Sequence, residues 1–305
     1  MLCWESWESV ASELDIKSND IEMDKQPFAR GGFGKVYKAT WRKDPVVIKV
    51  ISAYFEEEND EIIHEAELAL RLSHPHVIKL FGITRVKLMK LGIVMEVAEH
   101  GSLDKWIGQI HVDKLTKIAL GIIDGLTYVH SQHGIHRNIK PKNILMFGPS
   151  DDMIPKIADF GVSKLIEIAV VNKTRVGEEL YMAPEVTVFG RHSGYPADIY
   201  SLAMTLFELF NEQLIRESSD EIKSFIYGVR CGRMESIPES CKVPEYLRSI
   251  IQRGLDQDPK NRPLLSEYCS IIHGKYYFII SSCYNCGTNL SQHHSLLSHD
   301  CYAVV

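Results

Sequence analysis

The stretch HRNIKPKNIL, residues 136–145, gathers basic and amide side chains in one short segment that ends in an apolar run. His136 and Arg137 come first, and Lys140 and Asn143 follow closely. This combination is typical of a loop that handles phosphate groups. Such a loop works only if other segments of the chain hold the rest of the phosphate compound.

Composition places the chain among ordinary globular proteins. Its 305 residues, 45% apolar and 24% charged, are enough for one large domain or two lobes. A formal net charge of −6 gives no reason to expect nucleic acid as a partner, because the chain is not basic enough to offer phosphate contacts. The apolar runs are far shorter than the roughly 20 residues that a membrane span needs.

Two features favour a cytoplasmic location. The N-terminal segment MLCWESWESV contains acidic residues and no basic ones, so it does not resemble a secretory signal. The seven cysteines are odd in number and scattered, and six of them follow residue 230. This pattern favours reduced thiols over a disulfide framework.

Residues 21–98 have the pattern of a small, mostly antiparallel sheet with one helix. The segment PVVIKVI (45–51) is a short apolar strand interrupted by a single lysine. Residues 56–74 have the apolar spacing of a helix, and Pro75 ends it. Two further strands are predicted at residues 77–83 and 91–98.

From about residue 99 the pattern becomes helical. Residues 114–134 form a long amphipathic helix that is expected to end at Gly134, a good stop signal. Residues 197–210 are almost wholly apolar, which predicts a buried helix, and residues 243–255 predict another. The predicted class is therefore α+β, with a small β-rich lobe, a short hinge and a larger, mainly helical lobe.

Two features of the small lobe each allow two interpretations. Gly31, Gly32 and Gly34 could form a simple hairpin turn, or a flap whose backbone amides approach phosphates closely. Lys49 lies within an apolar strand, where a buried ammonium needs a partner. It could pair with Glu65 on the following helix and point toward a nucleotide, or it could extend to solvent.

The order of the motifs resembles the eukaryotic protein kinase family over about residues 21–273. The motifs are ARGGFGKV (29–36), VVIK (46–49), Glu65, HRNIKPKN (136–143), DFG (159–161), APE (183–185) and Arg262. The glycine loop and YMAPE are most similar to the tyrosine-kinase-like group, whereas Lys140-Pro141 is similar to the serine/threonine type. The resemblance implies a bilobal kinase fold with a small antiparallel sheet lobe and a larger helical lobe.

The resemblance divides the chain into an N-terminal extension (1–20), a kinase-like domain (21–273) and a non-kinase tail (274–305). Within the domain, it implies a small lobe at 21–97, a hinge at 96–101 and a large lobe at 102–273. The tail holds zinc-capable cysteines and histidines, but their spacing fits no standard finger. A disordered or loosely docked tail is the alternative.

The resemblance implies ATP and Mg²⁺ as cofactors, and it assigns roles by position. Asn143 and Asp159 would bind magnesium, and Lys140 would face the γ-phosphate. The residues implied to hold or surround the nucleotide are Ala29, Gly31, Gly32, Gly34, Val36, Lys49, Glu65, Met95, Glu96, Ala98 and Leu145.

Three further residues have structural roles by the same resemblance. Asp198, at the start of a buried helix, would tie down the backbone of the loop at 136–143. Glu185 and Arg262 would form a buried ion pair in the large lobe. These roles are expected in active and inactive relatives alike.

The sequence departs from the family near the site. Ala29 replaces the first glycine of the loop, which costs little unless that position needs a positive φ. Asn138 stands where the family has its catalytic Asp, and an amide is not a usable base at neutral pH. Glu178 replaces a threonine, so it could pair with Lys140 as a surrogate base or a plug, or it could be a solvated loop residue.

Two functions follow from these departures. The first is a pseudokinase, an ATP- and magnesium-binding signalling switch or scaffold that works by shape. The second is an active serine/threonine protein kinase of low turnover that transfers the γ-phosphate of ATP to protein hydroxyls. Neither interpretation names a protein partner or a substrate.

Overall fold

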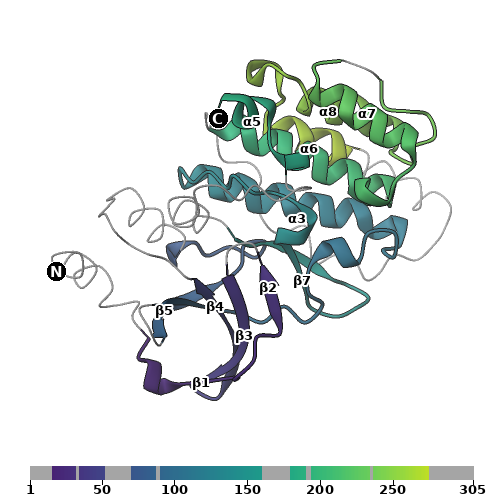
Figure 1. Cartoon of the computed structure of the whole chain (residues 1–305). Coiled ribbons are helices and arrows are strands. Elements are labelled where there is room, and N and C mark those ends of the chain that lie inside the picture. Colours follow the sequence, from purple (N-terminus) through teal and green to yellow (C-terminus); the bar gives the residue numbers. More distant parts are fainter. Residues whose placement is uncertain are drawn as a thin grey trace.

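The computed structural model describes residues 16–31, 34–51, 70–86, 90–159, 179–189, 194–233 and 236–274. Figure 1 shows two lobes, a curved sheet made by the N-terminal part (purple) and a group of helices made by the later part (teal to yellow). The predicted α+β class and the bilobal arrangement are confirmed. Most of the small-lobe helix predicted at 56–74 lies outside the described residues.

The small lobe is a six-stranded sheet in the order β1-β3-β4-β6-β5, with β2 paired to β3. All of its pairs are antiparallel. A two-residue turn at Arg42 and Lys43, both with positive φ, connects β3 to β4, as the twist of a tight hairpin requires. The strands are β1 (Ile21–Met23), β2 (Ala29–Gly31), β3 (Gly34–Trp41), β4 (Asp44–Ile51), β5 (Leu80–Val86) and β6 (Lys90–Met95).

Alternation along β4 directs its side chains to two separate apolar clusters. The outer cluster contains Ile16, Ala39, Val46, Ile48, Val50 and Val94. Val47 instead belongs to the cluster that continues into the large lobe. Because successive side chains of a strand point to opposite faces, Lys49 shares the inner face with Val47. The lysine therefore faces the large lobe.

The strand predicted at 77–83 begins three residues late, at Leu80. The N–H of Ile78 donates to the carbonyl of Ile157 at 2.9 Å, and Val77 forms a parallel bridge to the same residue. The start of the predicted strand is thus bound to the large lobe instead of the sheet. The strand predicted at 91–98 ends at Met95, where the connection between the lobes begins.

The large lobe is organised around α6 (Tyr195–Asn211), in which every residue from Ala197 to Asn211 is buried. The prediction of a buried helix at 197–210 is confirmed. A two-stranded sheet of β7 (Ile144–Phe147) and β8 (Ile154–Ile157) lies between this lobe and the small one (Figure 1). The other helices are α3 (Val112–Ser131), α5 (Pro184–Phe189), α7 (Asp220–Arg230), α8 (Glu245–Gly254) and a final helix at 265–274. Short 3-10 helices are η1 (Ser18–Asp20), η2 (Leu103–Lys105), η3 (Pro141–Asn143), η4 (Glu179–Tyr181), η5 (Ile215–Glu217) and η6 (Pro259–Asn261).

Helix α3 ends at Ser131, so the predicted end at Gly134 was wrong by three residues. His133 takes the left-handed conformation, with φ 61°. The N–H of Gly134 donates to the carbonyl of Val129, and that of His133 donates to the carbonyl of His130, both at 3.0 Å. This is the Schellman arrangement, but the left-handed position, usually a glycine, is occupied by His133, and Gly134 follows it.

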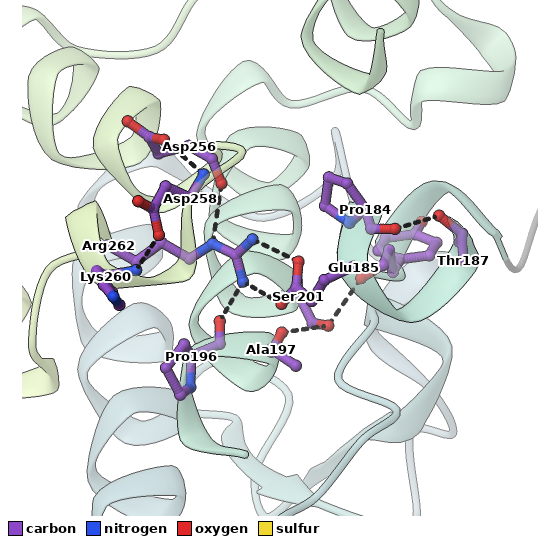
Figure 2. A network of polar contacts seen from close by, with 11 residues as sticks. Pro184, Glu185, Thr187, Pro196, Ala197, Ser201, Asp256, Asp258, Lys260 and Arg262 are labelled. Carbon is purple, nitrogen blue, oxygen red and sulfur yellow. Dashed lines mark hydrogen bonds and ion pairs between the residues drawn. The ribbon is translucent and has the colours of Figure 1, made fainter. Parts of the chain in front are cut away.

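A buried ion pair joins α5 to the segment that follows η6 in the large lobe (Figure 2). Arg262 donates to both carboxylate oxygens of Glu185, at 2.7 and 2.8 Å. Two more guanidinium hydrogens are donated to the carbonyls of Pro196 at 2.9 Å and Asp256 at 3.0 Å. Bidentate geometry and the additional hydrogen bonds make a buried pair of charges tolerable. The expected pairing of Glu185 with Arg262 is present.

Glu208 is a buried acidic residue of α6, at 1% exposure. Its carboxylate accepts hydrogen bonds from the Tyr181 hydroxyl at 2.7 Å and from the N–H of Ile215 at 2.8 Å. Burial raises the pKa of Glu208 to about 7, although both hydrogen bonds act in the opposite direction. The group therefore titrates near neutral pH.

The buried Glu208 makes stability depend on pH. The unfolded chain loses this proton near pH 4.5, whereas the folded protein keeps it up to about pH 7. The free energy of unfolding should therefore fall as pH rises through this window, by about 3 kcal/mol at most. Urea unfolding of the wild type and of Glu208→Gln at several pH values tests this. A difference between the two that does not change with pH would contradict it.

Candidate functional site

The loop at 136–143 is held from below by Asp198 of α6. One carboxylate oxygen accepts the N–H of Arg137 at 2.7 Å, and the other accepts the N–H of His136 at 2.8 Å. The ring Nε2 of His130 lies 2.9 Å from the second oxygen. Asp198 is fully buried, so these contacts are worth more than they would be at the surface. The expected role of Asp198 is thus present in the geometry.

His136 links this loop to the segment that carries Asp159. Its ring Nδ1 accepts the N–H of Asn138 at 3.2 Å, which leaves the proton on Nε2 for the carbonyl of Ala158 at 3.0 Å. Burial lowers the pKa of His136, and the charge of Asp198 only partly opposes this. The imidazole is therefore neutral and serves as a structural connector.

Asn143 and Asp159 are brought together by the backbone. The N–H of Ala158 donates to the carbonyl of Asn143 at 2.8 Å, so Asp159 follows directly after a fixed contact. The side-chain Nδ2 of Asn143 donates to the carbonyl of Asn138 at 2.8 Å. This bond orients the amide and leaves Oδ1 available as a ligand. A carboxylate and an amide oxygen are the donors that Mg²⁺ prefers.

An ion pair connects the two lobes at the site. Nζ of Lys49 lies 2.7 Å from Oδ1 of Asp159, and the lysine is 6% exposed. Asp159 has a left-handed backbone with φ 68°, which is uncommon outside glycine and frequent at functional sites. Burial acts to raise the pKa of Asp159, but Lys49, with smaller help from His136 and Lys140, keeps it below its usual value. The carboxylate is therefore ionised at neutral pH.

Asn138 makes its contacts through its backbone. Its N–H and carbonyl bind His136 and Asn143, whereas its side chain makes no hydrogen bond within the described ranges. The side chain is half-buried, and Lys140 beside it is buried at 4% exposure. The amide is thus placed at the site without being needed to build it.

The hinge follows directly from β6. Met95 is buried and pairs with Val47 and Leu80. In the described part of the chain, the carbonyl of Glu96 and the N–H of Ala98 make no hydrogen bond, so they can bind a ligand. Leu145 of β7 lies across from the far end of the hinge, where it bridges to Ser102.

The glycine loop is a hairpin of β2 and β3. Ala29 pairs with Val36, and Gly31 pairs with Gly34. Ala29 lies in a regular strand and has no positive φ, so the extra methyl group is accommodated. Val36 packs against the cluster shared by both lobes. The hairpin and flap interpretations are compatible with this arrangement.

Several predicted residues lie outside the described ranges: Gly32, Glu65, Glu178 and the zinc-capable residues of the tail. The proposed pairs of Lys49 with Glu65 and of Lys140 with Glu178 therefore stay predictions. Within the described residues there is no group of three or more histidine, cysteine or acidic side chains that could hold a metal. Over the same residues, no helix has the length and apolar character needed to cross a membrane.

Comparison with known proteins agrees with this geometry. The family described as "Protein kinase domain" matches residues 24–273. The chain belongs to the protein kinase family. The match includes the glycine hairpin, the lysine strand, the loop at 136–143 and the buried ion pair, so the kinase domain forms most of the chain.

This kinase domain is similar to serine/threonine kinases. Serine/threonine-protein kinase VIK of Arabidopsis thaliana is 30% identical over 271 residues, which is 84% of this chain and 59% of VIK. MAP kinase kinase kinase wis4 of Schizosaccharomyces pombe is 31% identical over 80% of this chain and 19% of its own length. Mitogen-activated protein kinase kinase kinase 10 of Xenopus laevis is 30% identical over 83% of this chain and 26% of its own length. The kinase domain spans only part of each relative.

Sequence reasoning missed two contacts of the site. His130 of α3 contacts Asp198, and Lys156 of β8 binds Glu96 of the hinge. Lys156 alternates with the buried Pro155 and Ile157, so the pattern of the strand placed it on the opposite face. Its partner could not be deduced, because the two residues are 60 positions apart.

Asp198→Asn tests how the loop is held. The amide cannot accept both backbone N–H groups, so one buried donor loses its partner. The free energy of unfolding should fall by about 1–3 kcal/mol. Urea unfolding measures this, and hydrogen exchange should speed up at the amides of His136 and Arg137.

The matched control is Asp113→Asn, which removes a carboxylate that is 76% exposed. It should change stability by less than about 0.5 kcal/mol. Equal effects of the two substitutions would contradict the assigned role of Asp198.

Proposed function

We propose that this kinase domain binds ATP and magnesium but transfers phosphate poorly, and that it acts as a pseudokinase, a signalling switch or scaffold. The observation that carries the proposal is Asn138, an amide at the position of the family's catalytic Asp. The charged residues Lys49, Lys140 and Asp159 are all kept beside it. Such a site binds its nucleotide better than it turns it over.

Binding of the nucleotide is supported by the charges of the site. Lys49, on the inner face of β4, would hold the α- and β-phosphates. Oδ1 of Asn143 and the carboxylate of Asp159 fit a magnesium ion, which would neutralise phosphate charge when bound. Lys140 would face the γ-phosphate. The remaining assigned residues are Glu65, which would orient Lys49; Ala29, Gly31, Gly32, Gly34 and Val36, above the nucleotide; and Met95, Glu96, Ala98 and Leu145, around the base.

Transfer lacks a base. In an active kinase, the Asp at this position accepts the proton of the substrate hydroxyl and orients that hydroxyl. The Asn138 amide has nearly the same shape, but its NH₂ donates where an acceptor is needed. Loss of a general base typically costs on the order of 10²–10⁴ in rate.

An active serine/threonine kinase of low turnover is the second candidate. It is favoured by Lys140, which is kept and buried. Phosphoryl transfer has a loose transition state that depends mainly on positioning and charge, so some rate could survive without a base. Glu178, as a surrogate base, would raise this rate further.

The domain layout is proposed as an extension at 1–20, a kinase domain at 21–273 and a tail at 274–305. The location is proposed as cytoplasmic. ATP is the proposed small-molecule partner, and nucleic acid is not expected. The relatives named above are longer than the match, so no substrate or protein partner of theirs is carried over.

Binding is tested by thermal stabilisation. Mg-ATP at about 100 times its dissociation constant should add about 2.7 kcal/mol of stability. Lys49→Met and Asp159→Asn should lose most of this gain, because they remove the groups proposed for phosphate and metal. Lys142→Met is the control, since Lys142 is an exposed lysine of the same loop. No stabilisation of the wild type would overturn the binding proposal.

Transfer is tested with labelled Mg-ATP and a generic basic protein substrate. Asn138→Asp should raise the rate by about 10²–10⁴, because it restores the base. The double variant Asn138→Asp/Lys49→Met should abolish this gain. A wild type that already exceeds Lys49→Met would support the active kinase instead, and Glu178→Gln would then show whether Glu178 supplies the base.

A further inference from the structure

The carboxylate of Glu96, the first residue of the hinge, is bound by two residues, Lys156 and Lys79. Nζ of Lys156 lies 2.8 Å from each carboxylate oxygen. The N–H of Lys79 donates to one of the same oxygens at 2.7 Å. The backbone N–H of Glu96 in turn donates to the carbonyl of Lys79 at 3.1 Å. The direction in which the chain leaves β6 is thus fixed by side chain and backbone together.

Lys156, the partner of Glu96 in this contact, belongs to the large-lobe side of the hinge. It lies on β8, where it pairs with Leu145 of β7. Its ammonium also lies over the ring of Phe147, 4.4 Å from the centroid. The side chains of Lys156 and Glu96 are 18% and 20% exposed. An ion pair shielded to this degree holds its geometry better than an exposed one.

The other end of the hinge is fixed to β7. The N–H of His100 donates to the carbonyl of Met146 at 3.2 Å, and the N–H of Met146 donates to the carbonyl of Gly101 at 2.8 Å. The ring of His100 contacts the carbonyl of Gly148 at 2.6 Å. The hinge is therefore held at both ends by the same two-stranded sheet.

The segment between these two attachments carries the open backbone groups. Within the described residues, the carbonyl of Glu96 and the N–H groups of Val97 and Ala98 make no hydrogen bond. A base that binds here needs these groups at set positions. Because the Glu96 side chain is bound to Lys156, displacement of the Glu96 backbone is restricted at the start of this segment.

We infer that Lys156 is a positioning residue for the base of the nucleotide. By holding the carboxylate of Glu96, it fixes the backbone groups of the hinge that would bind the base, without touching the base itself. The inference rests on the proposed function, since it assumes a nucleotide in this site. It assigns Lys156 to the base end of the nucleotide, whereas Lys49 serves the phosphate end.

The test measures the two ends of the nucleotide separately. Adenosine reports on the base end, and magnesium tripolyphosphate reports on the phosphate end. Calorimetric titration gives the dissociation constant of each for the wild type, Lys156→Met and Lys156→Arg. All titrations are run at a temperature where circular dichroism shows each variant to be folded.

Lys156→Met should raise the dissociation constant of adenosine about tenfold, which corresponds to about 1.4 kcal/mol. Lys156→Arg should stay within about twofold, because its guanidinium can bind the same carboxylate. Tripolyphosphate should bind all three proteins equally. Lys117→Met is the matched control, since Lys117 also pairs with a carboxylate, that of Asp152 near β8, but away from the hinge. This substitution should leave the dissociation constants of both ligands unchanged.

Glu96→Gln provides a second route if Lys156→Met does not fold. The amide keeps the shape of the side chain but loses its charge. The affinity for adenosine should therefore fall again, while the affinity for tripolyphosphate should not. In this background, Lys156→Met should cause little further loss, because the two residues act as one pair.

Two results would overturn the inference while leaving the proposed function intact. One is adenosine binding that does not change in Lys156→Met. The other is an equal loss of adenosine and tripolyphosphate, which would indicate a general structural role. A wild type that binds neither adenosine nor Mg-ATP would instead refute the proposed function itself.

Discussion

The buried carboxylate of Asp198 is the contact on which the site depends. The loop at 136–143 has a left-handed residue, Arg137, with φ 66°, and such a backbone persists only when its surroundings hold it. Asp198 does so by accepting the two successive N–H groups of His136 and Arg137. Its own position is rigid because α6 is buried almost from end to end. The large lobe thus supports the strained loop rigidly.

This way of building the loop explains how Asn138 can be present without damage to the fold. The hydrogen bonds that hold the loop use the N–H and the carbonyl of residue 138, and they do not involve its side chain. We therefore expect an amide in place of an acid to change the chemistry and not the geometry. The ion pair of Lys49 with Asp159 is independent of residue 138 and remains in place. Under the proposed function, binding and transfer are therefore expected to be separable in this architecture.

Several polar contacts among the described residues connect the lobes around the site. Lys49 reaches Asp159 from the sheet, and Glu96 reaches Lys156 from the hinge. The backbone of Ile78 adds a third contact, to Ile157. The residues before Asp159 and around the hinge are thus fixed by the same β7–β8 hairpin. A shift of one lobe against the other would therefore change the geometry at both ends of the site.

The sequence by itself determined the order of the two lobes, the buried helix α6, the position of Lys49 within an apolar strand and, through the family resemblance, the pairing of Glu185 with Arg262. Periodicity sets the first three because a helix or strand must bury one face, and the motif set the last. Only the tertiary structure decided that β5 begins at Leu80, where bonding to the large lobe stops. It also decided the contact of Lys156 with Glu96, 60 positions apart. Local patterns fix which face a side chain is on, but packing of the whole chain chooses the partner it meets.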